Sequence, residues 1–142
     1  MIMPERLTKA RRSFNMSRVK NRDTKPEMIV RSFLHKNGFR FRLCVAELPG
    51  HPDIVLHKYK TVIQVRGCFW HRHEGCKRAT TPQNNKDFWL DKFNANVARD
   101  KLADRQLRDQ GWNLIVIWEC QLKKHRVETL TSIITQIRER SD

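Results

Sequence analysis

Cysteine and histidine residues are concentrated in one short segment of this chain. The nine residues from Cys68 to Cys76 contain two thiols and the imidazoles of His71 and His73, and a third thiol, Cys120, follows a strongly apolar stretch. Tetrahedral zinc needs four such donors, and a compact knuckle with one distant ligand is a usual way to supply them. Five candidates compete for four positions, so one histidine is free for another role.

We interpret this predicted zinc site as structural. Three thiolates and one imidazole leave no open coordination position for a water or a substrate. The alternative is a set of buried cysteines and surface histidines without a metal. Cys44 lies alone in a predicted strand and is expected to be a small core residue rather than a ligand.

The chain has neither a signal-peptide pattern nor an apolar run of the ~20 residues that span a bilayer. We therefore expect a cytoplasmic protein without a membrane partner. In a reducing compartment, clustered cysteines are more often metal ligands than disulfides.

The charge balance is strongly positive. The 142 residues include 29 Lys and Arg against 15 Asp and Glu, a formal net charge of +14. This surplus favours a polyanionic partner, because neutralising phosphates releases condensed counterions. Residues 1–23 are basic and weakly apolar and are expected to form an arm. Residues 24–142 are expected to form a single domain, since the chain is too short for two ordinary cores.

Apolar periodicity and turn residues predict alternating helices and strands. Thr24 and Glu27 form a predicted capping box at the start of the first helix, and the apolar segment 112–118 predicts a strand buried on both faces. Residues 67–85 lack periodicity and are predicted to be a loop. The order indicates an α/β fold with a mixed central sheet flanked by helices. Helices are predicted over 24–37, 87–110 and 128–140, and strands over 39–45, 53–56, 61–65 and 112–118.

Several motifs occur in order along nearly the whole chain. They are Pro49-Gly-His-Pro-Asp53, Gly67-Cys-Phe-Trp-His71-Arg-His73, Cys76, the segment from Asp87-Phe-Trp-Leu90 through Asn96-Val-Ala-Arg-Asp100, and Trp118-Glu-Cys120. Together they resemble the very-short-patch repair (Vsr) mismatch endonucleases, and the likeness covers about residues 15 to 122. Gly-Cys-Phe-Trp-His is far more specific than a bare pair of spaced cysteines.

The resemblance implies a restriction-endonuclease-like fold and a DNA repair enzyme. Such an enzyme is a Mg²⁺-dependent hydrolase that nicks one strand of duplex DNA 5′ to the thymine of a T:G mismatch, which initiates very short patch repair. The expected partner is double-stranded DNA with a T:G mismatch, contacted by the basic arm. Mismatch-repair proteins are candidate partners, and the enzyme is expected to act as a monomer.

The resemblance also implies residue roles. His71 matches the catalytic histidine of the family, which would activate the attacking water, and Asp53 matches its essential metal-binding aspartate. Glu27 matches an acidic residue that supports the metal site, and Val65 would offer its backbone carbonyl to Mg²⁺. The zinc ligands of the family correspond to Cys68, His73, Cys76 and Cys120.

The residues alone leave ordinary alternatives open. Asp53 could simply cap a turn, His71 could be a zinc ligand or a phosphate contact, and Glu27 could serve only the capping box. Arg66 replaces the histidine that the family usually has at this position. A guanidinium can neutralise a phosphate, but it cannot act as an acid or base at neutral pH.

Aromatic residues on a pinned loop of a basic protein could wedge between base pairs beside a mismatch, where unstacking costs least. The resemblance implies this role for Phe69, Trp70 and Trp89, and for Met16 from the minor groove. Phe88 and Phe93 are expected in the core. The basic arm, including Arg18 and Lys20, is expected to contact phosphates. Candidates for ordering the site or the DNA from the long helix are Asn96, Arg99 and Asp100.

The sequence leaves two other functions open. The chain could be a zinc-stabilised mismatch-DNA-binding protein without cleavage activity, in which Arg66 marks a decayed site. It could also be a general restriction-type nuclease that cuts both strands of matched duplex.

Overall fold

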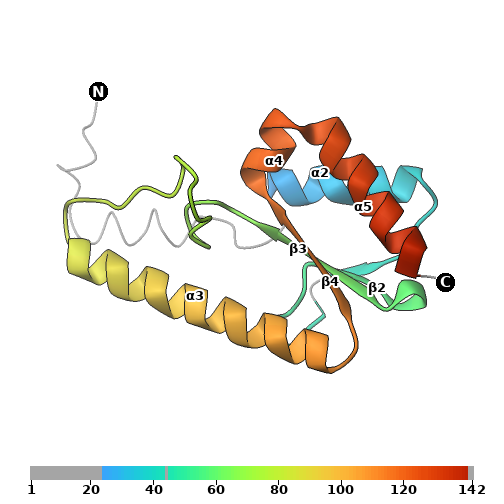
Figure 1. Ribbon diagram of the computed structural model, residues 1–142, viewed down its shortest axis with the longest axis horizontal. Coiled ribbons are helices and arrows are strands. Elements are labelled where there is room, and N and C mark those ends of the chain that lie inside the picture. The colour runs from blue at the N-terminus through green and yellow to red at the C-terminus, as the bar shows by residue number, and fades with distance from the viewer. Residues whose placement is uncertain (1–23, 44, 141–142) are drawn as a thin grey trace.

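A four-stranded sheet runs through the centre of the molecule (Figure 1). The computed structural model describes residues 24–43 and 45–140, so the predicted arm with Met16, Arg18 and Lys20, and the thiol of Cys44, lie outside the described residues. Antiparallel pairing joins β1 to β2 and β2 to β3, whereas β3 and β4 are parallel. The predicted mixed sheet is therefore confirmed. The strands, in their order across the sheet, are β1 (Arg42–Leu43), β2 (Ile54–Leu56), β3 (Thr61–Arg66) and β4 (Asn113–Trp118).

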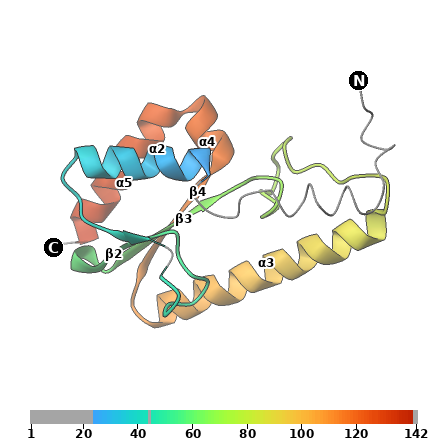
Figure 2. The same ribbon diagram turned by 180° about the vertical axis from the view of Figure 1, so that it is seen from behind.

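Helices cover both faces of this sheet. Helix α2 (Lys25–Lys36) and helix α5 (Arg126–Arg140) lie on one face, and helix α3 (Lys86–Asp109) lies on the other (Figures 1 and 2). A short helix, α4 (Glu119–Lys124), connects β4 to α5, and a 3-10 turn, η2 (His57–Tyr59), connects β2 to β3. No helix within residues 24–43 and 45–140 has the length and apolar character needed to span a membrane.

Alternating side chains on the strands divide the core into two layers. Ile63 and Val65 of β3 pack with Ile117 of β4 against α2 and α5. Val62 points to the opposite face of the sheet and packs with Leu107 of α3. Side chains of a strand point alternately to its two faces, so this arrangement follows from the apolar run of each strand. The polar side chains on the α3 face of β3 consequently point toward α3.

Local sequence signals explain the first helix and the hairpin. The Thr24 hydroxyl accepts a hydrogen bond from the Glu27 amide at 3.5 Å, so Thr24 is the N-cap of α2 as predicted. The chain leaves α2 through Gly38, whose φ of +81° suits a glycine. The turn between β2 and β3 consists of η2 and of Lys60 in the left-handed region.

Three expectations about elements need correction. The predicted strand 39–45 pairs only over β1, because just Arg42 and Leu43 align with β2. Strand β4 is not buried on both faces: Ile115 and Ile117 are buried, but its other face is half-exposed, since β4 is a sheet edge. Helix α4 was not predicted, and it begins directly after β4, where the Gln121 side chain accepts a hydrogen bond from the Trp118 amide at 2.9 Å.

The parallel pairing of β3 and β4 determines where the functional segments meet. Arg66 lies opposite Trp118 in the register, so both strands end at the same edge of the sheet. The knuckle 68–76 follows one strand and Cys120 follows the other. At the opposite side of the site, Gly50 lies so close to α3 that an added Cβ would come within 2.8 Å of the Ala103 Cβ.

Candidate active site

Four metal-ligating side chains meet where β3 and β4 end. The ligand atoms of this Cys/His cluster all lie within 4.8 Å of one another, and the cluster consists of Cys68, His73, Cys76 and Cys120. The Cys120 Sγ and the His73 Nδ1 are 3.4 Å apart. Donors at zinc–sulfur distances of about 2.3 Å in a tetrahedron are separated by about 3.8 Å, so this cluster has the dimensions of a closed metal site. It could hold a metal.

The surroundings of the cluster suit this role. Trp118 stacks on the His73 ring with centroids 4.3 Å apart and planes within 10°, which fixes the orientation of the imidazole. Burial raises the pKa of the Cys68 thiol, whereas a backbone hydrogen bond involving Arg78 lowers the pKa of the Cys76 thiol. A metal that binds these thiols must displace their protons, so binding is expected to strengthen with rising pH.

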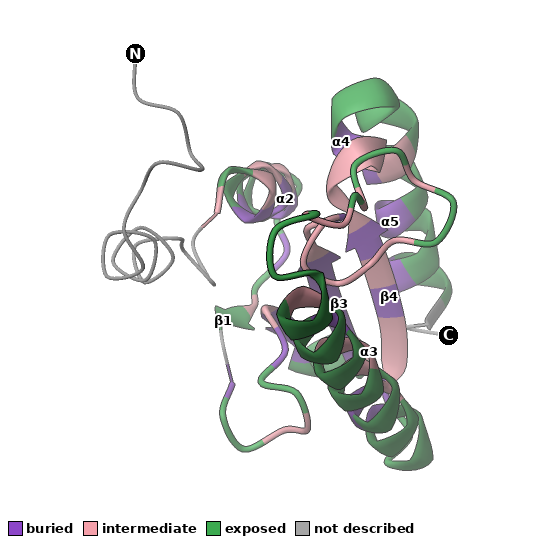
Figure 3. Cartoon of the chain, turned by 90° about the vertical axis from the view of Figure 1, so that its left-hand side faces the viewer, coloured by how far each residue is buried: buried purple, intermediate pink, exposed green. Residues whose placement is uncertain are grey.

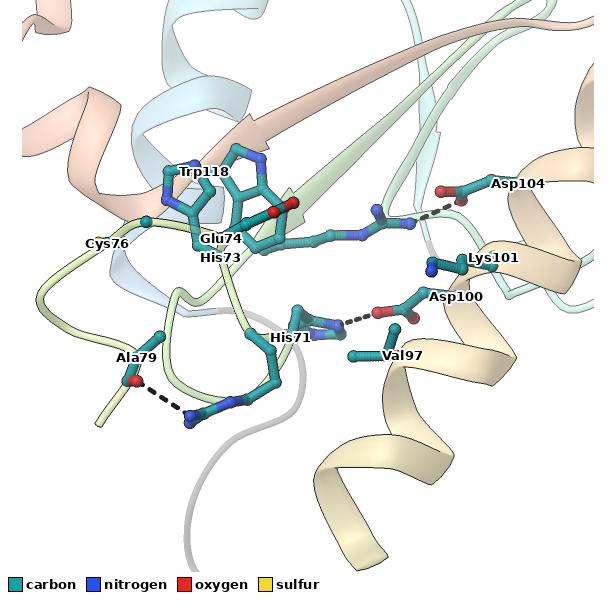
Figure 4. Close-up of a pocket in the computed structure, with 13 residues that line it drawn as sticks. His71, His73, Glu74, Cys76, Ala79, Val97, Asp100, Lys101, Asp104 and Trp118 are labelled. Carbon is teal, nitrogen blue, oxygen red and sulfur yellow. Dashed lines mark hydrogen bonds and ion pairs between the residues drawn. The ribbon is translucent and has the colours of Figure 1, made fainter. Parts of the chain in front are cut away.

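His71 lies outside the Cys/His cluster and faces α3. Its Nδ1 is 2.7 Å from the Asp100 Oδ2, and both side chains are partly exposed (Figure 4). A carboxylate oxygen accepts hydrogen bonds, so the Nδ1 of His71 donates to Asp100 and the Nε2 is turned away from this carboxylate. The contact fixes the orientation of the His71 ring relative to α3.

A second ion pair lies one helical turn further along α3. The Arg66 guanidinium donates to the Asp104 Oδ1 at 2.6 Å, and the two side chains are only 10% and 14% exposed. Residues four apart share a face of a helix, so Asp100 and Asp104 present two carboxylates side by side (Figure 4). Asp104 was missed from the sequence, although its spacing from Asp100 was a signal for a shared face.

Asp53 precedes β2 and points into the same region. Its Oδ2 accepts a hydrogen bond from the Val65 amide at 2.8 Å, and its own amide donates to the Gln64 side-chain oxygen at 3.3 Å. Burial raises the pKa of Asp53 from 3.8 to about 6; the Val65 hydrogen bond lowers it and the charge of Glu27 raises it further. A bound cation would stabilise the ionised form of this carboxylate.

Asp53 and His71 line one cleft of about 980 Å³. Arg66 and Asp100 also line it, and a second cavity of about 720 Å³ continues from these residues toward the knuckle. The structure thus brings together Asp53, the predicted metal ligand, His71, the predicted base, and Arg66. Val65 also lines this cleft.

Glu27 is close enough to influence Asp53 but does not line the cleft. Its side chain is buried, and Oε2 accepts a hydrogen bond from the Arg31 guanidinium at 3.0 Å. Glu27 therefore lies in the first turn of α2 and its charge also raises the pKa of Asp53. Pairing with Arg31 offsets the cost of burying this carboxylate.

An aromatic cluster extends from the knuckle to the first turns of α3. Phe69 lies 5.0 Å from Trp70 and 5.1 Å from Phe93, and Trp70 lies 6.0 Å from Trp89, all between ring centroids. Phe93 is buried, as predicted. The core assignment of Phe88 was wrong: it is 60% exposed, because the first turns of α3 extend beyond the sheet, and Figure 3 shows this end of the helix mostly green.

Arg72 anchors the loop that carries Phe69 and Trp70, a role that was not predicted from the sequence. Its guanidinium donates to the carbonyl oxygens of Thr80 at 2.8 Å and Ala79 at 2.9 Å, and lies 4.0 Å from the centroid of the Phe93 ring. Asn96 of α3 donates to the Trp70 carbonyl at 3.2 Å. The aromatic rings are thus held on a firmly anchored loop.

Comparison with known proteins identifies relatives of this chain. The family model described as DNA mismatch endonuclease Vsr matches residues 5–78. The Type II nicking enzyme V.NmeAIP of Neisseria meningitidis is 41% identical over 139 residues, which cover 96% of this chain and 99% of that protein.

Two further relatives are similar over most of their length. The Type II nicking enzyme V.XorIIP of Xanthomonas oryzae is 44% identical over 120 residues, covering 84% of this chain and 88% of that protein. The DNA mismatch endonuclease Vsr of Escherichia coli K12 is 42% identical over 115 residues, covering 81% of this chain and 73% of that protein.

Proposed function

The chain belongs to the family of Vsr DNA mismatch endonucleases, and from that premise we propose that it nicks one strand of duplex DNA 5′ to the thymine of a T:G mismatch. The observation that carries the proposal is the cleft in which the oriented His71 and the half-buried Asp53 face the same space. A base and a metal-binding carboxylate in one cleft are the two groups that metal-assisted phosphodiester hydrolysis requires.

In the proposed reaction, His71 acts as the general base. Its Nε2 takes a proton from a water molecule, and the resulting imidazolium is stabilised by the Asp100 carboxylate. The water oxygen forms a bond to phosphorus while the bond to the leaving sugar oxygen breaks. Asp53 and the Val65 carbonyl would hold Mg²⁺, which neutralises charge on the phosphate and on the leaving oxygen when bound. Glu27 would support Asp53 from behind.

The Cys/His cluster supplies the proposed structural zinc site. Three thiols and one imidazole fit zinc in a closed tetrahedral arrangement, so we assign the metal no step in hydrolysis. Its role is to anchor the knuckle, which carries His71 on one side and the aromatic rings on the other.

The aromatic cluster supports the preference for a mismatch. The rings of Phe69 and Trp70 on the anchored loop, with Trp89 in the first turn of α3, suit insertion beside a weakly stacked pair. Phe88, being exposed next to Trp89, joins this proposed DNA-contacting surface. Met16 from the arm is proposed to wedge from the other groove, and phosphate contacts are assigned to Arg18, Lys20 and Arg66.

Other parts of the proposal concern context. We infer that the mixed sheet with helices on both faces is a restriction-endonuclease-like fold, and that residues 1–23 form a DNA-contacting arm on the domain 24–142. The proposed enzyme works as a monomer in the bacterial cytoplasm, where its DNA substrate is located, with mismatch-repair proteins as candidate partners.

The test is a nicking assay on end-labelled duplexes that differ only in one base pair. We expect Mg²⁺-dependent cleavage of one strand of the T:G duplex, lost in Asp53→Ala and His71→Ala and retained in the exposed control Asp109→Asn. Wild-type protein that binds the mismatched duplex but never nicks it would establish the binding-only alternative. Equal cleavage of both strands in matched duplex would establish the restriction-type alternative.

A further inference from the structure

Arg66 is held in an unusual way for a cation that lines a DNA-sized cleft. It is the last residue of β3, on the face of the sheet that looks toward α3, and its side chain is 10% exposed. Within the described part of the chain, the guanidinium has one hydrogen-bond partner, the Asp104 Oδ1 at 2.6 Å. A guanidinium has five N–H donors, so most of them remain available on the cleft side.

The carboxylate partner is equally confined. Asp104 is 14% exposed and lies in the C-terminal half of α3, one helical turn after Asp100. A largely buried carboxylate is costly unless it is paired, and Arg66 provides that pairing. The pair therefore restrains both side chains, and the rigid helix determines the position of the guanidinium.

The same helix face also orients the proposed base. Asp100 pairs with His71 and Asp104 pairs with Arg66, and the two carboxylates are one helical turn apart. Both paired side chains, His71 and Arg66, line the cleft next to Asp53. Helix α3 thus sets the spacing between the His71 imidazole and the Arg66 guanidinium. With this spacing the imidazole can bind a water while the guanidinium binds a phosphate.

The charge of the cleft shows why the orientation of Arg66 matters. Four carboxylates line the cleft or its continuation and oppose the approach of a phosphate, namely Asp53, Glu74, Asp100 and Asp104. Arg66 is a permanent cation that lines both cavities and is paired with Asp104. Its charge assists hydrolysis only when its free donors point at the phosphate oxygen on which charge develops.

We propose that Asp104 is a positioning residue of the nicking reaction. It holds the Arg66 guanidinium so that the remaining N–H donors bind one non-bridging oxygen of the phosphate that is cleaved. The proposal rests on the nicking function proposed above and adds to it a role for a residue that makes no contact with DNA. In this role a fixed guanidinium replaces a titratable imidazole at position 66.

The test is a double-mutant cycle measured by single-turnover nicking of a T:G duplex. Asp104→Asn removes a negative charge, so DNA affinity stays equal or becomes tighter, while the nicking rate falls roughly tenfold to a hundredfold because Arg66 loses its orientation. Arg66→Gln lowers both affinity and rate. In the Arg66→Gln background, Asp104→Asn causes no further loss of rate. Asp104→Glu, which keeps the carboxylate, restores part of the rate.

Stereospecific sulfur substitution gives a readout that a purely structural role would not move. When each non-bridging oxygen of the cleaved phosphate is replaced in turn by sulfur, the wild type should discriminate between the two diastereomers. Asp104→Asn and Arg66→Lys should both reduce that discrimination. Asp109→Asn, the same chemical change at an exposed position of α3, is the matched control and should behave as wild type.

Clear outcomes overturn the proposal. Independent losses from Asp104→Asn and Arg66→Gln that multiply in the double variant would show that Asp104 does not act through Arg66. An unchanged rate in folded Asp104→Asn would do the same, and if that variant fails to fold, the comparison of Asp104→Glu with Arg66→Lys decides. A wild type that does not nick would refute the proposed function itself, and this inference with it.

Discussion

Replacing Asp53 by asparagine should abolish nicking and at the same time stabilise the metal-free protein. Asparagine is nearly isosteric, and its side-chain oxygen can still accept the hydrogen bond from the Val65 amide. What the substitution removes is a carboxylate whose pKa burial raises from 3.8 to about 6. A group with a raised pKa binds its proton more tightly in the folded state than in the unfolded state, so ionising it opposes folding.

The magnitude follows from this difference in pKa. The contribution of Asp53 to stability is complete below pH 4, and it is lost as the pH rises through about 6. At about 1.4 kcal/mol per pKa unit, the unfolding free energy lost at pH 7.5 is about 3 kcal/mol. Asp53→Asn should recover this amount at pH 7.5 and only about 0.5 kcal/mol at pH 4, where the carboxylate is largely protonated in the folded protein.

The assay is urea and thermal unfolding of wild type and Asp53→Asn in Mg²⁺-free buffer at both pH values, with Asp109→Asn as an exposed control. We expect Tm at pH 7.5 to rise by roughly 5–10 °C in Asp53→Asn. Added Mg²⁺ should raise the Tm of the wild type but not of the variant, since only the carboxylate binds the ion. A variant no more stable than wild type at pH 7.5, or a difference that does not shrink at pH 4, would refute the reasoning.

Three further predictions test other parts of the site. His71→Gln should lower the single-turnover nicking rate by roughly 10²- to 10⁴-fold with little change in DNA affinity, and Asp100→Asn should cause a smaller loss; a wild-type rate in His71→Gln would exclude it as the base. Cys120→Ala should lower both the zinc content per chain, measured by elemental analysis, and the Tm; undiminished zinc would remove Cys120 from the ligand set. Gly50→Ala should cost about 1–3 kcal/mol in urea unfolding, because φ is +74° and the new Cβ would press on Ala103; unchanged stability would contradict this close approach.

The elements that could be predicted from the sequence are those with long, regular patterns. Helix α3 was expected over 87–110 and extends over 86–109, and β4 was expected over 112–118 and extends over 113–118. The short helix α4 escaped prediction because it follows a strand without any glycine or proline to mark a boundary. The predicted strand 39–45 was too long because strand pairing depends on a partner, and alternation within one segment does not reveal how far the partner extends.

The site shows the same limit at the level of single residues. The sequence alone left five candidates for four metal positions, and only the resemblance separated His71 from the ligands. The structure brings the four assigned donors together and directs His71 to Asp100 instead. Asp104 could not be predicted, because its partner Arg66 is 38 residues away and lies on a strand. A periodicity argument identifies which residues share a face, but not which element that face will meet.

The parallel pairing of β3 with β4 has a consequence for how the molecule reaches this structure. The two strands are separated in sequence by the whole knuckle loop and α3, so their pairing must close a long loop before any contact stabilises it. A metal bound by Cys68 and Cys120 would cross-link the two segments that follow directly after these strands. Zinc should therefore accelerate refolding as well as stabilise the product, and the last strand should be the slowest element to acquire protection from hydrogen exchange when refolding begins without it.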